Sequence, residues 1–455
     1  MLSLVVILFV LGYAAIALEH QININKAASA LLTGVLCWTV YACNADALVP
    51  AGAFEAWHGA QPAQDASYEA SLLSPKLEFL LDGQLMHLFA EIAGVLFFLV
   101  GAMTIVELVD ANEGFSWITR WIRAKNKVRL LWIIAWFTFF LSSVLDNLTT
   151  TIVMISVLKK LVHDRETRLL FVGIVIIAAN AGGAWTVIGD VTTTMIWMKH
   201  KIGEWEVIRA LLFPSAVCLL IPLLGLSLKL RGDLEPNPEA GNGSQDIVLP
   251  EWHKGLFLLL GLAGLLSVPI FKATTHLPPF LGMMLSLGAL WLVSELISKD
   301  MDERTRSSTG VLSALRHIDL SSVLFFLGIL LAVGALGSMG LLRQLAEFLE
   351  RTVESHAAIA ILIGLVSAVV DNVPLVAAGI EMYQSVHGMN DSFWMLLAYC
   401  GGTGGSCLII GSAAGVAAMG LEKIDFFWYA RHVSWLALAG YFAGLLAYAL
   451  QQSLL

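Results

Sequence analysis

The chain has 455 residues, of which 58% are hydrophobic and only 13% are charged. A soluble globular domain is about 25% charged, so this composition excludes an ordinary soluble protein. The apolar residues gather in runs of about 20, which is the length that crosses a hydrocarbon core about 30 Å thick. The lipid bilayer is therefore the predicted partner, and the net charge of −9 gives no reason to expect nucleic acid binding. The five cysteines follow no metal-ligand or disulfide spacing, and we expect no cofactor.

Apolar run length predicts simple membrane spans in both halves of the chain. In chain order they lie near residues 1–18, 27–45, 84–109, 206–231, 255–272, 277–297, 318–340 and 433–452. Two more apolar stretches, about 168–199 and about 393–420, are long but interrupted by glycines, which is typical of discontinuous helices. Because residues 1–18 lack the basic start of a signal peptide, we expect them to be a retained span.

Two further apolar segments, about 128–160 and about 357–383, are predicted to be re-entrant hairpins. Lys and Arg flank both ends of the first segment, and cytoplasmic loops are the ones enriched in these residues. A segment with both ends on one side has a non-helical tip at depth, which must be buried in protein or line a cavity. The second segment has acidic flanks, which indicate external ends. The two hairpins are therefore expected to have opposite orientations.

The two halves also repeat each other in sequence. Ser, Val, Asp and Asn recur in register between the tips at 142–149 and 367–374. The glycine pair at 182–183 recurs at 404–405, at a similar distance from each tip. We therefore predict an all-α polytopic membrane protein with two inverted-topology repeats, each with a re-entrant hairpin and a discontinuous transmembrane helix. Secondary transporters with this layout bind their substrate between the repeats near the bilayer midplane.

The repeats set the predicted domain boundaries. The first inverted repeat is expected to span 1–231 and the second 255–455. Residues 232–254 are expected to be a cytoplasmic linker.

The acidic residues in these apolar segments are the first candidates for a site. Asp146 and Asp371 stand at the two tips, each followed by Asn, and a carboxylate at membrane depth is a functional candidate by default. The structural alternative is that these residues cap the helix after each tip, and both roles can hold together. Asp190 follows the glycines of the first broken span. Carboxylate, hydroxyl and carbonyl oxygens suit a hard cation.

The remaining polar candidates lie in the same segments, except for one acid. Glu91 stands near the start of an apolar span, one turn after His87, and it is a candidate for a proton path or an interfacial carboxylate. For Thr149 and Thr150 an alternative stays open, because a threonine in a membrane helix often bonds its own backbone. The cation- and proton-binding candidates are Asp146, Asn147, Thr149, Thr150, Asn180, Asp190, Thr192, Thr193, Ser367, Asp371, Asn372, Thr403, Ser406 and Ser412.

Clustered carboxylates favour a cation over an anion as the substrate. Desolvation and neighbouring negative charge favour the protonated form of a buried carboxylate. A cation and a proton then compete for the same oxygens, which is the physical basis of exchange.

Two tip motifs carry a resemblance to a known family. They read Ser142-x-x-x-Asp146-Asn147 and Ser367-x-x-x-Asp371-Asn372-x-Pro374. With the glycine-broken spans that follow, they resemble the ion transporter superfamily, and the chain looks most like the NhaD-type sodium/proton antiporters. The resemblance implies exchange of Na⁺ or Li⁺ for H⁺ across the bacterial inner membrane by a homodimer. It implies arms at 112–127 and 341–356 between a scaffold domain and a transport domain.

The resemblance also selects functional positions. It points to Asp146, Asn147, Asn180, Asp190, Thr192, Thr193, Ser367, Asn372, Ser406 and Glu91, with Na⁺ held through Asp146, Asn147, Asp190 and Asn372. Three alternatives remain at this point: an organic-anion or oxyanion transporter of the same superfamily, an intramembrane aspartyl protease and a passive channel. The protease is disfavoured because Val187-Ile188-Gly189-Asp190 departs from its usual Gly-x-Gly-Asp motif. We therefore expect a transporter and no enzymatic activity.

Overall fold

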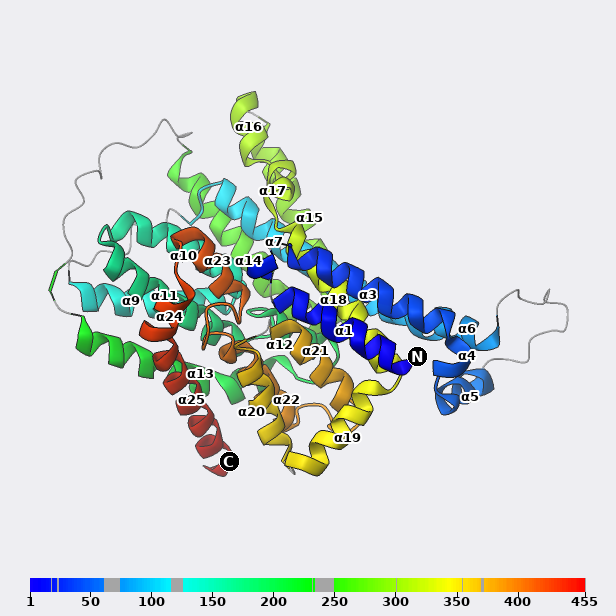
Figure 1. Cartoon of the computed structure of the whole chain (residues 1–455). Helices are drawn as coiled ribbons and strands as arrows, with labels where there is room; N and C mark the ends of the chain where they lie inside the picture. Colours follow the sequence, from blue (N-terminus) through cyan, green and yellow to red (C-terminus); the bar gives the residue numbers. More distant parts are fainter. Residues whose placement is uncertain are drawn as a thin grey trace. The chain divides into compact units, whose positions relative to one another are not determined.

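The computed structural model is helical throughout its regular secondary structure (Figure 1). It describes residues 1–17, 19–22, 24–60, 74–115, 126–230, 232–233, 249–299, 301–353, 355–369 and 372–454. Within these ranges, eight helices are long and apolar enough to cross a membrane. The predicted all-α polytopic membrane protein is confirmed at this level.

The helices of the first half are α1 Leu2–Ala17, α2 Glu19–Ile22, α3 Lys26–Cys43, α4 Ala45–Leu48, α5 Ala51–Ala60, α6 Pro75–Glu78, the π-helix η1 Phe79–Leu85, α7 Met86–Ala111, α9 Lys127–Ser142, α10 Asn147–Leu161, α11 Arg165–Ala184, α12 Val191–Met198 and α13 Glu204–Lys229. Those of the second half are α14 Glu251–Thr275, α15 Pro279–Ser298, α16 Glu303–Thr309, α17 Val311–His317, α18 Leu320–Ser338, α19 Leu341–Val353, α20 His356–Val366, α21 Asn372–Tyr383, α22 Ser392–Gly404, α23 Ala413–Glu422, α24 Phe426–His432 and α25 Ser434–Leu454. Each simple span predicted from run length falls on one of these helices.

The chain forms two compact units. The first unit comprises Met1–Phe97, Asp319–His356 and Ala377–Val386. The second unit comprises Phe98–Ile318, Ala357–Val376 and His387–Leu455, and it contains both tip motifs and both glycine-broken segments.

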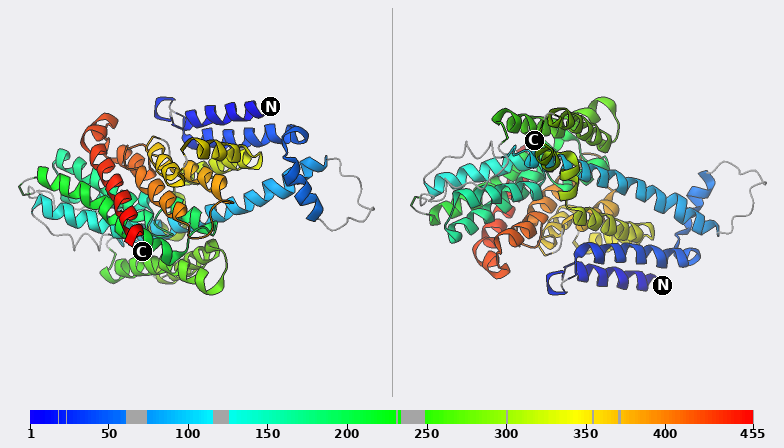
Figure 2. Two further views of the ribbon diagram at one scale, coloured as in Figure 1. Left: turned by 90° about the horizontal axis from the view of Figure 1, so that it is seen from below. Right: turned by 90° about the horizontal axis from the view of Figure 1, so that it is seen from above.

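Close helix packing organises the first unit. Helices α1, α3 and α18 lie side by side (Figure 2). A Cβ atom on Gly34 of α3 would lie 2.5 Å from the carbonyl oxygen of Gly328 of α18. Small residues allow such backbone contact between membrane helices. Trp38 then donates its Nε1–H to the carbonyl of Leu331 at 2.9 Å, which fixes the register of the pair.

Helices are interrupted at four predicted positions, and all four breaks lie in the second unit. Helix α9 ends at Ser142 and α10 begins at Asn147, while α11 ends at Ala184 and α12 begins at Val191. In the second half, the corresponding gaps separate α20 from α21 and α22 from α23. The predicted breaks are therefore present, whereas the re-entrant hairpins and their membrane orientation remain predictions.

The predicted arms and linker are described only in part. Residues 116–125 of the first arm and most of the linker at 232–254 lie outside the described residues. In the second arm, α19 is an amphipathic helix that buries Leu342 and Ala346 on one face.

Candidate functional site

The first tip places its aspartate at the start of α10. The backbone N–H of Thr149 donates to Oδ1 of Asp146 at 2.8 Å, and the Thr149 hydroxyl donates to Oδ2 at 2.7 Å. The capping interpretation of Asp146 is therefore correct. Asp146 also lines a cavity of about 20 Å³, whose other lining residues are mostly apolar and belong to the first tip, the first broken segment, α7, α14 and α15. That volume is enough for about one water molecule.

The second aspartate of the first half is used differently. Asp190 occupies the N-cap position of α12, but its carboxylate makes no capping hydrogen bond. Instead, Oδ1 accepts a hydrogen bond from the amide of Asn147 at 2.9 Å, and Oδ2 accepts one from the hydroxyl of Thr192. Asp190 is buried, with 2% of its surface exposed. Both oxygens of this buried carboxylate therefore accept hydrogen bonds from side chains and not from the backbone at the start of α12, and a buried charge requires such partners.

Asn180 connects the two halves of the chain. Its Oδ1 accepts a hydrogen bond from the amide of Asn147 at 3.0 Å. Its Nδ2 donates to the hydroxyl of Ser406 at 3.0 Å and to that of Ser412 at 2.9 Å. The side chain is completely buried on α11. The cluster of Asn147, Asn180, Asp190, Ser406 and Ser412 is hereafter called the asparagine cluster.

The second tip contacts the backbone of α22 next to the asparagine cluster. Asn372 donates its amide to the carbonyl of Gly401 in α22 at 3.1 Å. A Cβ atom on the next residue, Gly402, would lie 3.6 Å from Oδ2 of Asp190. The second tip is thus anchored to the turn of α22 that packs against the asparagine cluster. Its aspartate, Asp371, lies outside the described residues.

The glycine pairs allow equivalent close contacts in the two halves. A Cβ atom on Gly183 would lie 2.3 Å from the carbonyl oxygen of Gly189, and one on Gly405 would lie 2.6 Å from that of Gly411. Real Cβ atoms do not approach backbone atoms so closely. The close contact within each broken segment therefore requires glycine, at position 183 in the first half and at position 405 in the second.

The same glycines hold each broken segment against the tip that precedes it. A Cβ atom on Gly189 would lie 2.6 Å from the carbonyl oxygen of Ser142, and one on Gly411 would lie 2.7 Å from that of Ser367. Ser142 and Ser367 are the serines that the sequence placed in register between the two tips. The first contact is reinforced by Thr186, whose hydroxyl donates to the carbonyl of Ser143 at 2.5 Å.

Several predicted hydroxyl ligands have local partners. Thr403 donates to the carbonyl of Tyr399 in its own helix at 2.6 Å, as threonines in membrane helices often do. Ser367 donates to the carbonyl of Gly364 at 2.7 Å, and Thr193 to that of Ala184 at 3.5 Å.

The hydroxyls of Thr150 and Thr151 differ from these. Both are buried, and neither has a hydrogen-bond partner among the residues that the structure describes. Glu91 belongs to the first unit, where its carboxylate is 37% exposed and lies 3.9 Å from the His87 ring.

Sequence reasoning missed two contributors to the site. Gly401 and Gly402 bring the α22 backbone next to Asp190, and the signal was present as an additional glycine pair just before the pair at 404–405. Thr186 fastens the first tip to the first broken segment, and the sequence offers no distinctive signal for it.

Comparison with known proteins identifies relatives of this chain. A family model described as citrate transporter matches residues 4–385. Sodium/proton antiporter 2 of Arabidopsis thaliana is 41% identical over 97% of this chain and 98% of its own length. Sodium/proton antiporter 1 of the same plant is 45% identical over 97% of this chain and 71% of its own length. The Na(+)/H(+) antiporter NhaD of Vibrio cholerae is 28% identical over 98% of this chain and 90% of its own length.

The chain belongs to the NhaD-type sodium/proton antiporter family. The predicted family is thereby confirmed, and its membership rests on alignments that cover nearly the whole chain. For a member of this family, the asparagine cluster offers one carboxylate together with amide and hydroxyl oxygens. Such oxygen donors suit hard cations better than soft ones.

Proposed function

We propose that this chain is a secondary antiporter that exchanges Na⁺, and also Li⁺, for H⁺ by alternating access. The observation that carries the proposal is the asparagine cluster, in which the buried carboxylate of Asp190 faces Asn147 rather than capping its own helix. The negative charge of Asp190 attracts a monovalent cation, and the surrounding amide and hydroxyl oxygens can replace part of that cation's hydration shell.

Competition for Asp190 supplies the exchange. When a proton occupies one carboxylate oxygen, the group is neutral and offers the cation far less electrostatic attraction. When the cation binds, the proton must leave to the side to which the site is open. Each ligand therefore displaces the other, and alternating exposure of the site moves them in opposite directions.

We propose Asp146, Asn147, Asp190 and Asn372 as the Na⁺ ligands. The other predicted positions contribute in two ways. Thr149, Thr150, Asn180, Thr192, Thr193, Ser367, Thr403, Ser406 and Ser412 support the ligands or add oxygens, and Asp371 is proposed to act with Asn372. Glu91 is proposed for the proton path.

The proposed framework is two inverted repeats, 1–231 and 255–455, joined by the linker 232–254, each with a re-entrant hairpin. The equivalent contacts of Gly189 with Ser142 and of Gly411 with Ser367 support the repeat. We further propose a homodimer. The bacterial inner membrane remains our proposed location, although relatives come from both Vibrio cholerae and Arabidopsis thaliana.

The test is exchange in everted membrane vesicles that hold an imposed proton gradient reported by a pH-sensitive dye. NaCl, LiCl, KCl and sodium citrate are added in turn to vesicles with the native chain, with Asp190→Asn or with Asp319→Asn. Asp319 is an exposed N-cap of α18 and serves as the matched control. We expect Na⁺ and Li⁺ to collapse the gradient in the native and Asp319→Asn vesicles only. Uptake of labelled citrate without any response to monovalent cations would overturn the proposal in favour of the organic-anion alternative.

A further inference from the structure

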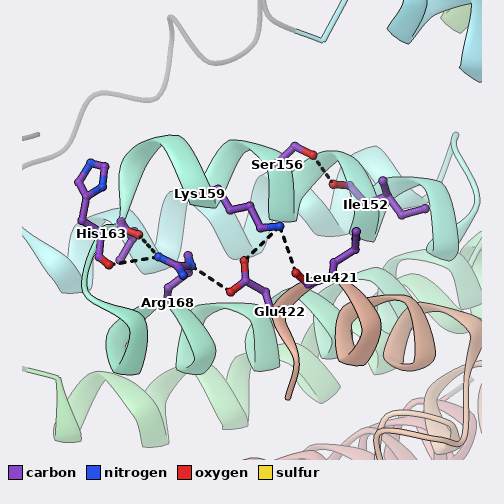
Figure 3. A network of polar contacts seen from close by, with 8 residues as sticks. Ile152, Ser156, Lys159, His163, Arg168, Leu421 and Glu422 are labelled. Atoms are coloured by element: carbon purple, nitrogen blue, oxygen red, sulfur yellow. Dashed lines mark hydrogen bonds and ion pairs between the residues drawn. The ribbon is translucent and has the colours of Figure 1, made fainter. Parts of the chain in front are cut away.

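A buried carboxylate lies at the end of the second broken segment. Glu422 is the last residue of α23, and its side chain is 3% exposed. Arg168 Nε donates to Glu422 Oε2 at 3.0 Å, and Lys159 Nζ lies 3.8 Å from Oε1 (Figure 3). Lys159 also donates to the carbonyl of Leu421 at 3.1 Å. The C-terminal turn of α23 is therefore held by two cations from the first half of the chain.

Arg168 is also held by hydrogen bonds to backbone carbonyls. Its Nη1 donates to the carbonyls of Val162 at 2.9 Å and His163 at 3.1 Å, in the turn between α10 and α11 (Figure 3). One guanidinium thus joins the end of α10, the start of α11 and the end of α23. Both α10 and α11 also pack directly against α23.

These three helices carry three of the five members of the asparagine cluster at their other ends. Asn147 begins α10, Asn180 lies near the end of α11, and Ser412 caps α23. At the rise of an α-helix, Lys159 lies about 18 Å along the axis from Asn147, and Glu422 lies about 15 Å from Ser412. The ion pairs therefore connect these helices near one end, and the asparagine cluster connects them near the other end.

We propose that Glu422 is a positioning residue, which keeps the serine hydroxyls of the second broken segment within reach of Asn180. The inference rests on the proposed cation site. Asn180 donates to Ser406 and Ser412 only while α23 stays in place against α11. Removing the carboxylate leaves the guanidinium of Arg168, whose side chain is 18% exposed, without its countercharge at this contact. A charge that loses its partner in a largely buried contact is destabilising. The end of α23 then shifts, and the serines shift with it.

The test is Na⁺/H⁺ exchange by the full chain in proteoliposomes, with the half-saturating Na⁺ concentration and the maximal rate measured separately. We expect Glu422→Gln to raise the half-saturating concentration about tenfold, which corresponds to 1.4 kcal/mol, while the maximal rate stays within about twofold. Arg168→Gln should act in the same direction, and the double variant should be no worse than either single variant because the two residues act as a unit. Glu422→Asp should restore part of the affinity.

Matched variants separate this inference from the site on which it rests. Glu295→Gln removes an exposed ion pair with Arg306 and should leave both parameters unchanged. If Glu422→Gln leaves the half-saturating concentration unchanged while Asn180→Ala raises it, the positioning role is overturned and the site stands. If neither variant alters it, the proposed site itself fails. If Glu422→Gln fails to insert into the membrane, Lys159→Gln tests the same ion pair from its half-exposed partner. An unchanged half-saturating Na⁺ concentration in Lys159→Gln would then overturn the positioning role of Glu422.

Discussion

Replacement of Asn180 by alanine tests the central contact of the site. The native side chain makes three hydrogen bonds, one accepted from Asn147 and two donated to Ser406 and Ser412. All of them are buried in the second unit, so alanine leaves their partners without a direct replacement. The two serine hydroxyls lose the donor that orients their oxygens.

The expected magnitude follows from these contacts. Each buried hydrogen bond contributes about 1 kcal/mol net, so the three together amount to about 3 kcal/mol. Part of this loss falls on folding and part on cation binding. If about half falls on binding, the half-saturating Na⁺ concentration rises about tenfold.

Another buried asparagine provides a matched control. Asn112 donates to the carbonyls of Leu108 at 2.8 Å and Thr309 at 3.0 Å, and its Oδ1 lies 2.7 Å from His253 Nε2. Asn112→Ala removes the same side-chain amide from the same number of contacts at a position outside the proposed cation site. We expect both variants to lower the thermal unfolding temperature of the purified protein by similar amounts.

Only Asn180→Ala should change the Na⁺ dependence of exchange in proteoliposomes. Equal rises in half-saturating Na⁺ for Asn180→Ala and Asn112→Ala would refute the reasoning, because the effect would then reflect general destabilisation. An unchanged Na⁺ dependence in Asn180→Ala would also refute it.

Two further substitutions test the tip and the broken segment. Gly183→Ala would place a Cβ atom 2.3 Å from the Gly189 carbonyl oxygen, so we expect loss of exchange and a lower unfolding temperature. The control is Gly420→Ala, which adds a Cβ atom in open space and should be neutral or slightly stabilising. Full exchange in Gly183→Ala would contradict the proposed contact. Asp146→Ser keeps an N-cap oxygen but removes the carboxylate, so it should retain stability yet lose exchange in dye-loaded vesicles. Full exchange in Asp146→Ser would show that Asp146 caps α10 and takes no part in transport.

The sequence by itself determined the helical membrane architecture and the places where helices break. Run length sets which segments can cross a bilayer, and glycines together with polar tip residues set where a helix cannot continue, because both depend on local chemistry. For this reason the simple spans, and the breaks before Asn147 and Val191, lie where they were predicted. The tip motifs were also specific enough to indicate the family.

Only the tertiary structure decided which polar groups meet. Asp146 and Asp190 look alike in sequence, yet one caps its own helix while the other faces Asn147. Asn180 binds hydroxyls more than two hundred residues away along the chain, and Glu422 pairs with Arg168 across a similar separation. Such contacts depend on how closely remote helices pack and on where each side chain then points, and no local pattern in the sequence encodes either quantity.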